Sequence, residues 1–113
     1  MFMTIVYVAS PLAGDVSTNL EKARKYCRMV SDKGCLPLAP HTIFTQFLDD
    51  GNEKERSLGM RMGLRLLKRC DELWVFGNDI TTGMKAEITV ANEYKLPIRW
   101  FDETGEEIVS CKD

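Results

Sequence analysis

Apolar and polar residues follow two kinds of pattern along this chain. Short continuous apolar runs, rich in β-branched and aromatic residues, are typical of strands buried on both faces of a sheet. Longer segments with apolar residues every three or four positions are typical of amphipathic helices. The pattern predicts strands over 4–9, 35–39, 71–76 and 96–101 and an edge strand over 107–111. It predicts helices from residues 17–19 to Gly34, over 52–69 and over 84–95.

Strands and helices therefore alternate, with short connections between them. This order is typical of α/β proteins in which helices cover both faces of a parallel sheet. We predict a single domain over residues 1–113 with a three-layer, flavodoxin- or Rossmann-like fold and a four- to five-stranded, mainly parallel sheet. Such sheets bind ligands at the carboxyl ends of their strands, where the strand order reverses. We expect this point between the loops that follow strands 4–9 and 71–76.

Each predicted helix has an apolar stripe that should face the sheet. The expected inward residues are Leu20, Ala23, Cys27 and Val30, then Leu58, Met62, Leu66 and Leu67, then Ala86, Val90, Ala91 and Tyr94. Ser17, Thr18 or Asn19 is expected to cap the first helix. Gly59 and Gly63 share one face of the second helix, which suits a tight helix contact, and a dimer interface is one place for such a contact.

Composition limits the function classes. Hydrophobic content of 44% and charged content of 28% are ordinary for a globular protein, and the net charge of -2 provides no general attraction to nucleic acid polymers or anionic membranes. The four cysteines are dispersed and there is one histidine, so we expect reduced thiols and no zinc site. The first ten residues are apolar but contain no basic residue, which argues against a signal or membrane segment and predicts a cytoplasmic protein.

The loop between strand 71–76 and the next helix is the first candidate site. It contains Gly77, Asn78, Thr81, Thr82, Gly83 and Met84. Backbone N–H groups at a helix start favour an anion, so this loop is a candidate for binding a phosphate or carboxylate. The alternative is that Thr81 or Thr82 only caps the helix.

Three further side chains are candidates because of where they stand. Glu87 lies one turn inside the helix. Its negative charge either only interacts favourably with the N-terminal end of the helix dipole, or the side chain projects into a pocket as a nucleophile or base. Tyr7 is either a core residue or a hydrogen-bond donor to that carboxylate. His41 is either a satisfied loop or core histidine or a ligand contact. It lies in an unusually apolar segment over 40–50, which either forms a pocket wall or belongs to the core or a subunit contact. Ser10 and Pro11 follow the first strand and complete the expected ligand-binding set.

Four segments resemble a known family: Tyr7–Pro11 (YVASP), Ala39–His41 (APH), Cys70–Gly77 (CDELWVFG) and Thr82–Glu87 (TGMKAE). They are similar to small uncharacterised bacterial and phage proteins (DUF4406/DUF7768-like). These proteins resemble a branch of the nucleoside 2-deoxyribosyltransferase superfamily, which also contains the 2′-deoxynucleoside 5′-monophosphate N-glycosidases. The resemblance covers nearly the whole chain.

The resemblance implies a role for each matching residue. Glu87 corresponds to the glutamate that attacks the sugar C1′, and Tyr7 to the tyrosine that orients it. Thr81 stands where the hydrolases have a phosphate-binding serine, which favours a nucleotide ligand. The family requires no metal or cofactor. Related enzymes complete their sites across a subunit interface, so a homo-oligomer, a dimer or larger, is implied.

The chain departs from the enzymes at one position. They carry a sugar-binding aspartate about eight residues before Asp71, where this chain has Gly63, and no carboxylate lies between Leu58 and Cys70. Asp49 or Asp50 is a candidate replacement. The leading hypothesis is cleavage or transfer of the N-glycosidic bond of a nucleotide or nucleoside. The alternatives are a non-catalytic module that senses or sequesters such a ligand, and a structural oligomer with a vestigial pocket.

Overall fold

The structure is a computed structural model that describes residues 3–108 of the chain. Its elements, in chain order, are β1 (Ile5–Ala9), α1 (Val16–Asp32), β2 (Leu36–Leu38), α2 (Pro40–Phe44), α3 (Glu53–Leu67), β3 (Glu72–Phe76), α4 (Thr82–Glu93) and β4 (Ile98–Phe101). Their order agrees with the predicted alternation. The predicted loop over 40–50 is different, because it begins with the short helix α2, whose first residue Pro40 suits a helix start. None of the helices in the described part is long and apolar enough to cross a membrane.

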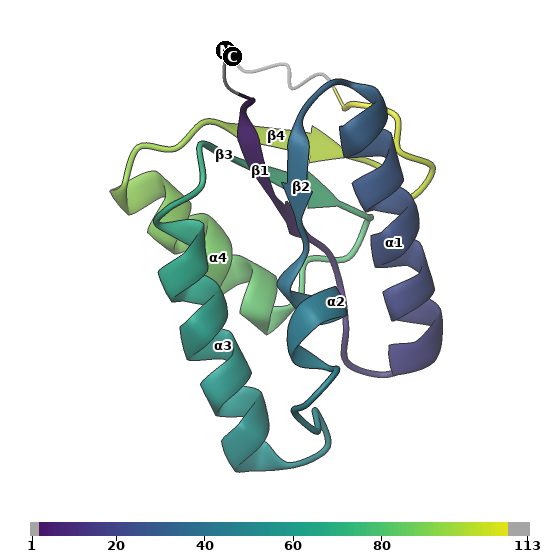
Figure 1. The fold of residues 1–113 in the computed structure, drawn as a ribbon, viewed down its shortest axis with the longest axis vertical. Coiled ribbons are helices and arrows are strands. Elements are labelled where there is room, and N and C mark those ends of the chain that lie inside the picture. Colours follow the sequence, from purple (N-terminus) through teal and green to yellow (C-terminus); the bar gives the residue numbers. More distant parts are fainter. Residues whose placement is uncertain (1–2, 109–113) are drawn as a thin grey trace.

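The four strands form one parallel sheet in the order β2-β1-β3-β4 (Figure 1). The strand order reverses between β1 and β3, which is where this class of fold binds ligands. The fold prediction is therefore confirmed, with four strands. Of the fifth strand predicted over 107–111, the described residues show one isolated antiparallel bridge between Phe101 and Glu107; the rest lies outside the described residues.

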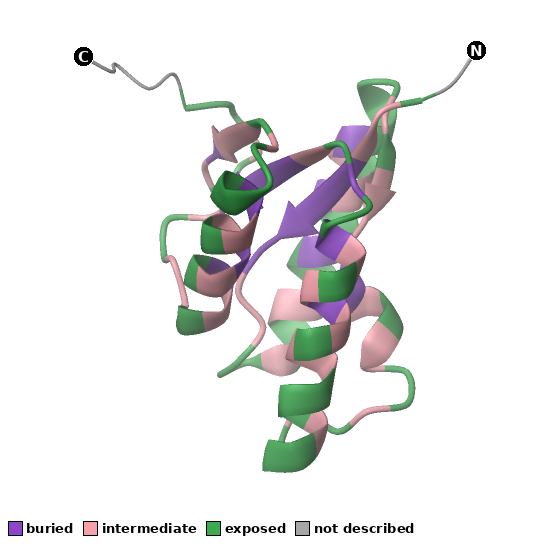
Figure 2. Cartoon of the chain, turned by 90° about the vertical axis from the view of Figure 1, so that its left-hand side faces the viewer, coloured by how far each residue is buried: buried purple, intermediate pink, exposed green. Residues whose placement is uncertain are grey.

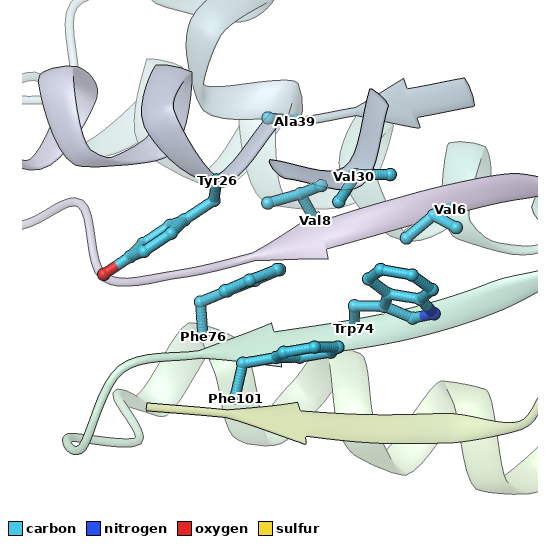
Figure 3. Close-up of a cluster of buried hydrophobic side chains, with 8 residues drawn as sticks. All are labelled: Val6, Val8, Tyr26, Val30, Ala39, Trp74, Phe76 and Phe101. Atoms are coloured by element: carbon cyan, nitrogen blue, oxygen red, sulfur yellow. The ribbon is translucent and has the colours of Figure 1, made fainter. Parts of the chain in front are cut away.

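The helices cover both faces of the sheet, and the strand residues alternate between them. On one face, Val6 and Val8 of β1 pack in a cluster with Trp74, Phe76 and other buried residues, beneath α1 (Figure 3). On the other face, the intervening residues of β1 and β3 pack with buried residues of α3 and α4. Figure 2 shows the buried residues concentrated on the central sheet, with exposed residues on the outer sides of the helices. This alternation places Tyr7 on the α3–α4 face.

Helix α1 differs from the prediction at its start and on its inner face. Its N-cap is Asp15, whose Oδ1 accepts a hydrogen bond from Thr18 N at 3.2 Å, so none of the three predicted residues is the cap. Tyr26, which the predicted stripe omitted, is buried and stacks on Phe76 with 4.5 Å between ring centroids. A tyrosine ring lies in this core because its hydroxyl reaches the Glu103 carbonyl oxygen at 3.3 Å.

Helices α3 and α4 depart from their predicted stripes near their ends. Leu58, in the first half of α3, is 37% exposed, whereas Gly63 and Leu67 in the second half are buried. The first turns of α3 extend past the sheet, so they have no strand to cover (Figure 1). Tyr94, expected on the inner side of α4, is 51% exposed because it forms the C-cap and follows the last helical turn.

Candidate active site

A buried tyrosine and a buried glutamate meet between the sheet and the α3–α4 layer. Tyr7 Oη donates a hydrogen bond to Glu87 Oε2 at 2.5 Å, across 80 positions of sequence. The two side chains are 1% and 5% exposed, respectively. Glu87 Oε1 has no hydrogen-bond partner among residues 3–108. One carboxylate oxygen is therefore held by a neutral donor, and the other keeps its capacity to accept a hydrogen bond.

The absence of a side chain at Gly63 makes room for this contact. A Cβ atom built on Gly63 would lie 2.9 Å from Tyr7 Oη, which is closer than real Cβ contacts allow. The close approach predicted for the glycine face of α3 therefore occurs within the chain, against the first strand. Gly59 differs, since a Cβ there would lie 3.6 Å from Leu48 Cδ1, an ordinary van der Waals contact. Gly63 is buried by the chain itself, whereas Gly59 is half-buried and lines the cavity described below; a dimer contact on this face stays a prediction.

Burial changes the proton affinity of both groups. Desolvation raises the pKa of Glu87 from 4.5 to about 7, although the hydrogen bond from Tyr7 opposes this shift. Burial and the neighbouring carboxylate raise the pKa of Tyr7 well above its usual value. Tyr7 therefore stays protonated as a donor at neutral pH, while Glu87 changes between its acid and carboxylate forms there.

The tyrosine–glutamate pair opens into a cavity of about 520 Å³. This volume lies within the usual range for small-molecule sites. Its walls come from the β1–α1 loop, α2 and the turn after it, α3 and the start of α4. The lining residues are Tyr7, Leu12, Ala13, Pro40, His41, Phe44, Thr45, Leu48, Asp50, Glu55, Arg56, Gly59, Met60, Gly63, Thr81, Thr82, Gly83, Met84, Ala86 and Glu87.

Seven of the predicted site residues line this cavity. They are Tyr7, His41, Thr81, Thr82, Gly83, Met84 and Glu87. The other four, Ser10, Pro11, Gly77 and Asn78, lie outside its lining. Gly77, with φ of +103°, turns the chain at the end of β3, and a Cβ there would meet Pro11 Cδ at 3.6 Å. The two loops thus meet as predicted, but Pro11 and Gly77, which approach each other, do not line the cavity.

Ser10 contacts His41, which lines the cavity. Its carbonyl oxygen lies 3.1 Å from His41 Nε2, and its buried hydroxyl has no partner within the described residues. Because a carbonyl oxygen only accepts, Nε2 must carry the proton of the neutral ring. Burial lowers the pKa of His41 below 6.5, so the ring is neutral at pH 7. His41 therefore connects α2 to the end of β1 and leaves Nδ1 as an acceptor.

The start of α4 combines a cap with free backbone donors. Thr81 is the N-cap, and its Oγ1 accepts a hydrogen bond from Met84 N at 3.2 Å. The N–H groups of Thr82 and Gly83 occupy the first positions of the helix, where no helical carbonyl precedes them. Capping and anion binding are thus compatible here, because the cap occupies one donor and leaves two for a ligand.

Most of the α3 side of the cavity was not predicted from the sequence. Glu55, Arg56 and Met60 line it, as does Asp50 from the preceding turn. Of the two candidate carboxylates, Asp50 faces the cavity, whereas Asp49 Oδ1 accepts a hydrogen bond from Gly51 N at 2.9 Å. The available signal was the glycine pair on α3, which marks the face of closest approach.

The described part of the chain contains no group of three or more His, Cys, Asp or Glu side chains placed to hold a metal ion. The polar groups that line the cavity are instead three carboxylates, one imidazole, hydroxyls, backbone N–H groups and one guanidinium. Such groups bind organic ligands and anions directly.

The fold and cavity define an α/β protein with a tyrosine–glutamate pair at the switch point of a parallel sheet. Residues 4–101 match the family described as Domain of unknown function (DUF7768), and the chain belongs to this family. Among solved structures, the fold is similar to a 2-deoxyribosyltransferase from the psychrotolerant bacterium Bacillus psychrosaccharolyticus. The TM-score is 0.66 at 22% sequence identity, covering 95% of this chain and 77% of that one. No curated protein matches the sequence. The family and the fold implied by the resemblance are thereby confirmed.

Proposed function

We propose that the protein cleaves or transfers the N-glycosidic bond of a 2′-deoxynucleotide or deoxynucleoside, with Glu87 as the nucleophile. The observation that carries this proposal is the buried hydrogen bond between Tyr7 Oη and Glu87 Oε2 on the wall of a cavity of about 520 Å³. The similarity in fold to a 2-deoxyribosyltransferase supports the choice of substrate class.

The reaction follows the double displacement used by retaining glycosidases. Glu87 Oε1 attacks C1′ and forms a glycosyl ester, while the C1′–N bond breaks and its electron pair leaves with the base. Water or a second base then attacks C1′ and releases the carboxylate. Tyr7 donates to Oε2 throughout, so it fixes the direction of Oε1 and stabilises the ionised form.

The pKa of Glu87 sets a condition on this chemistry. Only the carboxylate form is nucleophilic, and with a pKa of about 7 roughly half of the free protein has it at neutral pH. Positive charge develops on the sugar in the transition state and attracts a negative nucleophile. We therefore expect kcat/KM to rise with pH and level off above 7.

We propose that the 5′-phosphate of a nucleotide binds at the start of α4. The N–H groups of Thr82 and Gly83 and the hydroxyl hydrogen of Thr81 are available there, about one helical turn from Glu87. A 5′-phosphate at this end places C1′ toward Glu87 and the base toward α2 and the turn after it, where Phe44 and Leu48 provide apolar contact.

The second candidate is a module that binds the same ligand without turnover. The observation that favours it is Gly63: no carboxylate projects from this face of α3 beside Tyr7, and a Cβ there would collide with Tyr7 Oη. Sugar hydroxyls then have fewer fixed partners near Glu87.

One experiment separates the candidates. A panel of deoxynucleotides and deoxynucleosides is incubated with the wild type and with Glu87→Ala, and free base is measured by chromatography. Release by the wild type alone supports the enzyme. Calorimetric binding without release supports the binding module, and neither release nor binding rejects both.

A further inference from the structure

Two opposite charges line the outer part of the cavity and are not engaged with each other. Asp50 lies in the turn before α3, and Arg56 lies on the first turns of α3. Among residues 3–108, neither side chain has a hydrogen bond or an ion pair. Other charged pairs do meet, such as Arg99 with Glu107, and the neighbouring Glu55 accepts from Asp49 N at 2.6 Å. Asp50 and Arg56 thus keep their hydrogen-bonding capacity for a ligand.

Asp50 and Arg56 lie where the base of a nucleotide would reach them, given the proposed places of its sugar and phosphate. Arg56 precedes Gly63 by seven residues, which is about 10 Å along α3. Gly63 marks the Tyr7–Glu87 end of the cavity, and Met60 and Gly59 lie between the two ends. If the sugar lies at Glu87 and the phosphate at the start of α4, as in the proposed function, the remaining direction leads past Phe44 and Leu48 to Asp50 and Arg56.

The chemistry of this pair favours one base. A carboxylate accepts two parallel hydrogen bonds, and guanine offers N1–H and N2–H side by side. A guanidinium donates a fork of hydrogen bonds, and guanine offers O6 and N7 as a pair of acceptors. Adenine has one amino group on that edge and turns the N1 lone pair toward the second carboxylate oxygen. Thymine has a single N–H between two carbonyl groups.

We infer that Asp50 and Arg56 select guanine, with Asp50 accepting from N1–H and N2–H and Arg56 donating to O6 or N7. This inference rests on the proposed function for the placement of sugar and phosphate. It adds the base preference of the site and two residues that determine it.

The test measures binding rather than turnover. Calorimetry with dGMP, dAMP, dCMP and dTMP is performed on the full chain carrying Glu87→Gln, which keeps the side-chain shape and removes the nucleophile. We expect dGMP to bind about 5- to 150-fold tighter than dAMP, which is the range by which a good bidentate pair discriminates between bases. Adding Arg56→Gln should remove most of that preference. Arg61→Gln is the matched control, because Arg61 is exposed on the same helix and does not line the cavity.

A gain of binding distinguishes recognition from damage to the fold. An amide at position 50 offers both a donor and an acceptor, which suits adenine. Asp50→Asn should therefore weaken dGMP and strengthen dAMP, a change that misfolding cannot produce. Equal affinity for all four nucleotides, or a preference that neither substitution alters, overturns this inference and leaves the proposed function standing. Absence of binding by every nucleotide overturns this inference and also the proposed action on nucleotides.

Discussion

The hydrogen bond from Tyr7 to Glu87 should determine the pH at which the protein works. Tyr7→Phe removes the hydroxyl and keeps the ring in the core, so the pKa of Glu87 should rise above its value of about 7. A hydrogen bond to a charged group contributes about 1.5–3 kcal/mol, which corresponds to a rise in pKa of about one to two. The ionised fraction at pH 7 should then fall from about one half to between about a tenth and a hundredth.

The assay is kcat/KM for base release from a deoxynucleotide between pH 5.5 and 9.5, followed by chromatography. For Tyr7→Phe we expect a loss of about five- to fiftyfold at pH 7 that narrows at higher pH, with the midpoint of the profile displaced upward. The reasoning is refuted if the loss is the same at every pH, or if both proteins share one midpoint. Either result would mean that Tyr7 does not control the ionisation of Glu87.

Three further substitutions test the physical basis of the site. The pKa of Glu87 is raised from 4.5 to about 7, so its contribution to stability is present below pH 4.5 and is lost as pH rises to 7. Chemical denaturation should therefore show that the free energy of unfolding falls by about 3 kcal/mol over this range, and Glu87→Gln should abolish the fall. Gly63→Ala should destabilise the protein by about 1–3 kcal/mol through contact with Tyr7, whereas the control Gly59→Ala should be neutral or stabilising by up to about 1 kcal/mol; equal effects would contradict the assigned packing. Asp15→Ala should cost about 1 kcal/mol by removing the cap of α1, and an unchanged melting temperature would argue against that cap.

The order of the strands and helices could be predicted from the sequence because their signals are local. The run from Leu73 to Phe76 is apolar over every residue, as a strand buried on both faces must be. The boundaries were less predictable. Asp15 caps α1, yet Ser17, Thr18 and Asn19 are all good caps by residue type, and only the path of the preceding loop selects among them.

The cavity was less predictable because its walls are distant in sequence. Glu87 and the start of α4 could be placed from their position after β3, since loops at the carboxyl ends of parallel strands form ligand sites. Arg56 and Met60 could not, because they lie in the first half of α3, distant in sequence from the loops at the strand ends. Gly63 was recognised as a site of close approach, but which segment approaches it depends on the crossing of α3 over β1.

The central claim is that Glu87 forms a covalent bond to the sugar. The most direct measurement is mass spectrometry of the protein quenched rapidly after mixing with a 2′-deoxynucleotide, followed by peptide mapping. We predict an added mass equal to deoxyribose 5-phosphate less one water, located on residue 87 and absent from Glu87→Gln. Release of base by Glu87→Gln at the wild-type rate, with no adduct on the wild type, would contradict the claim.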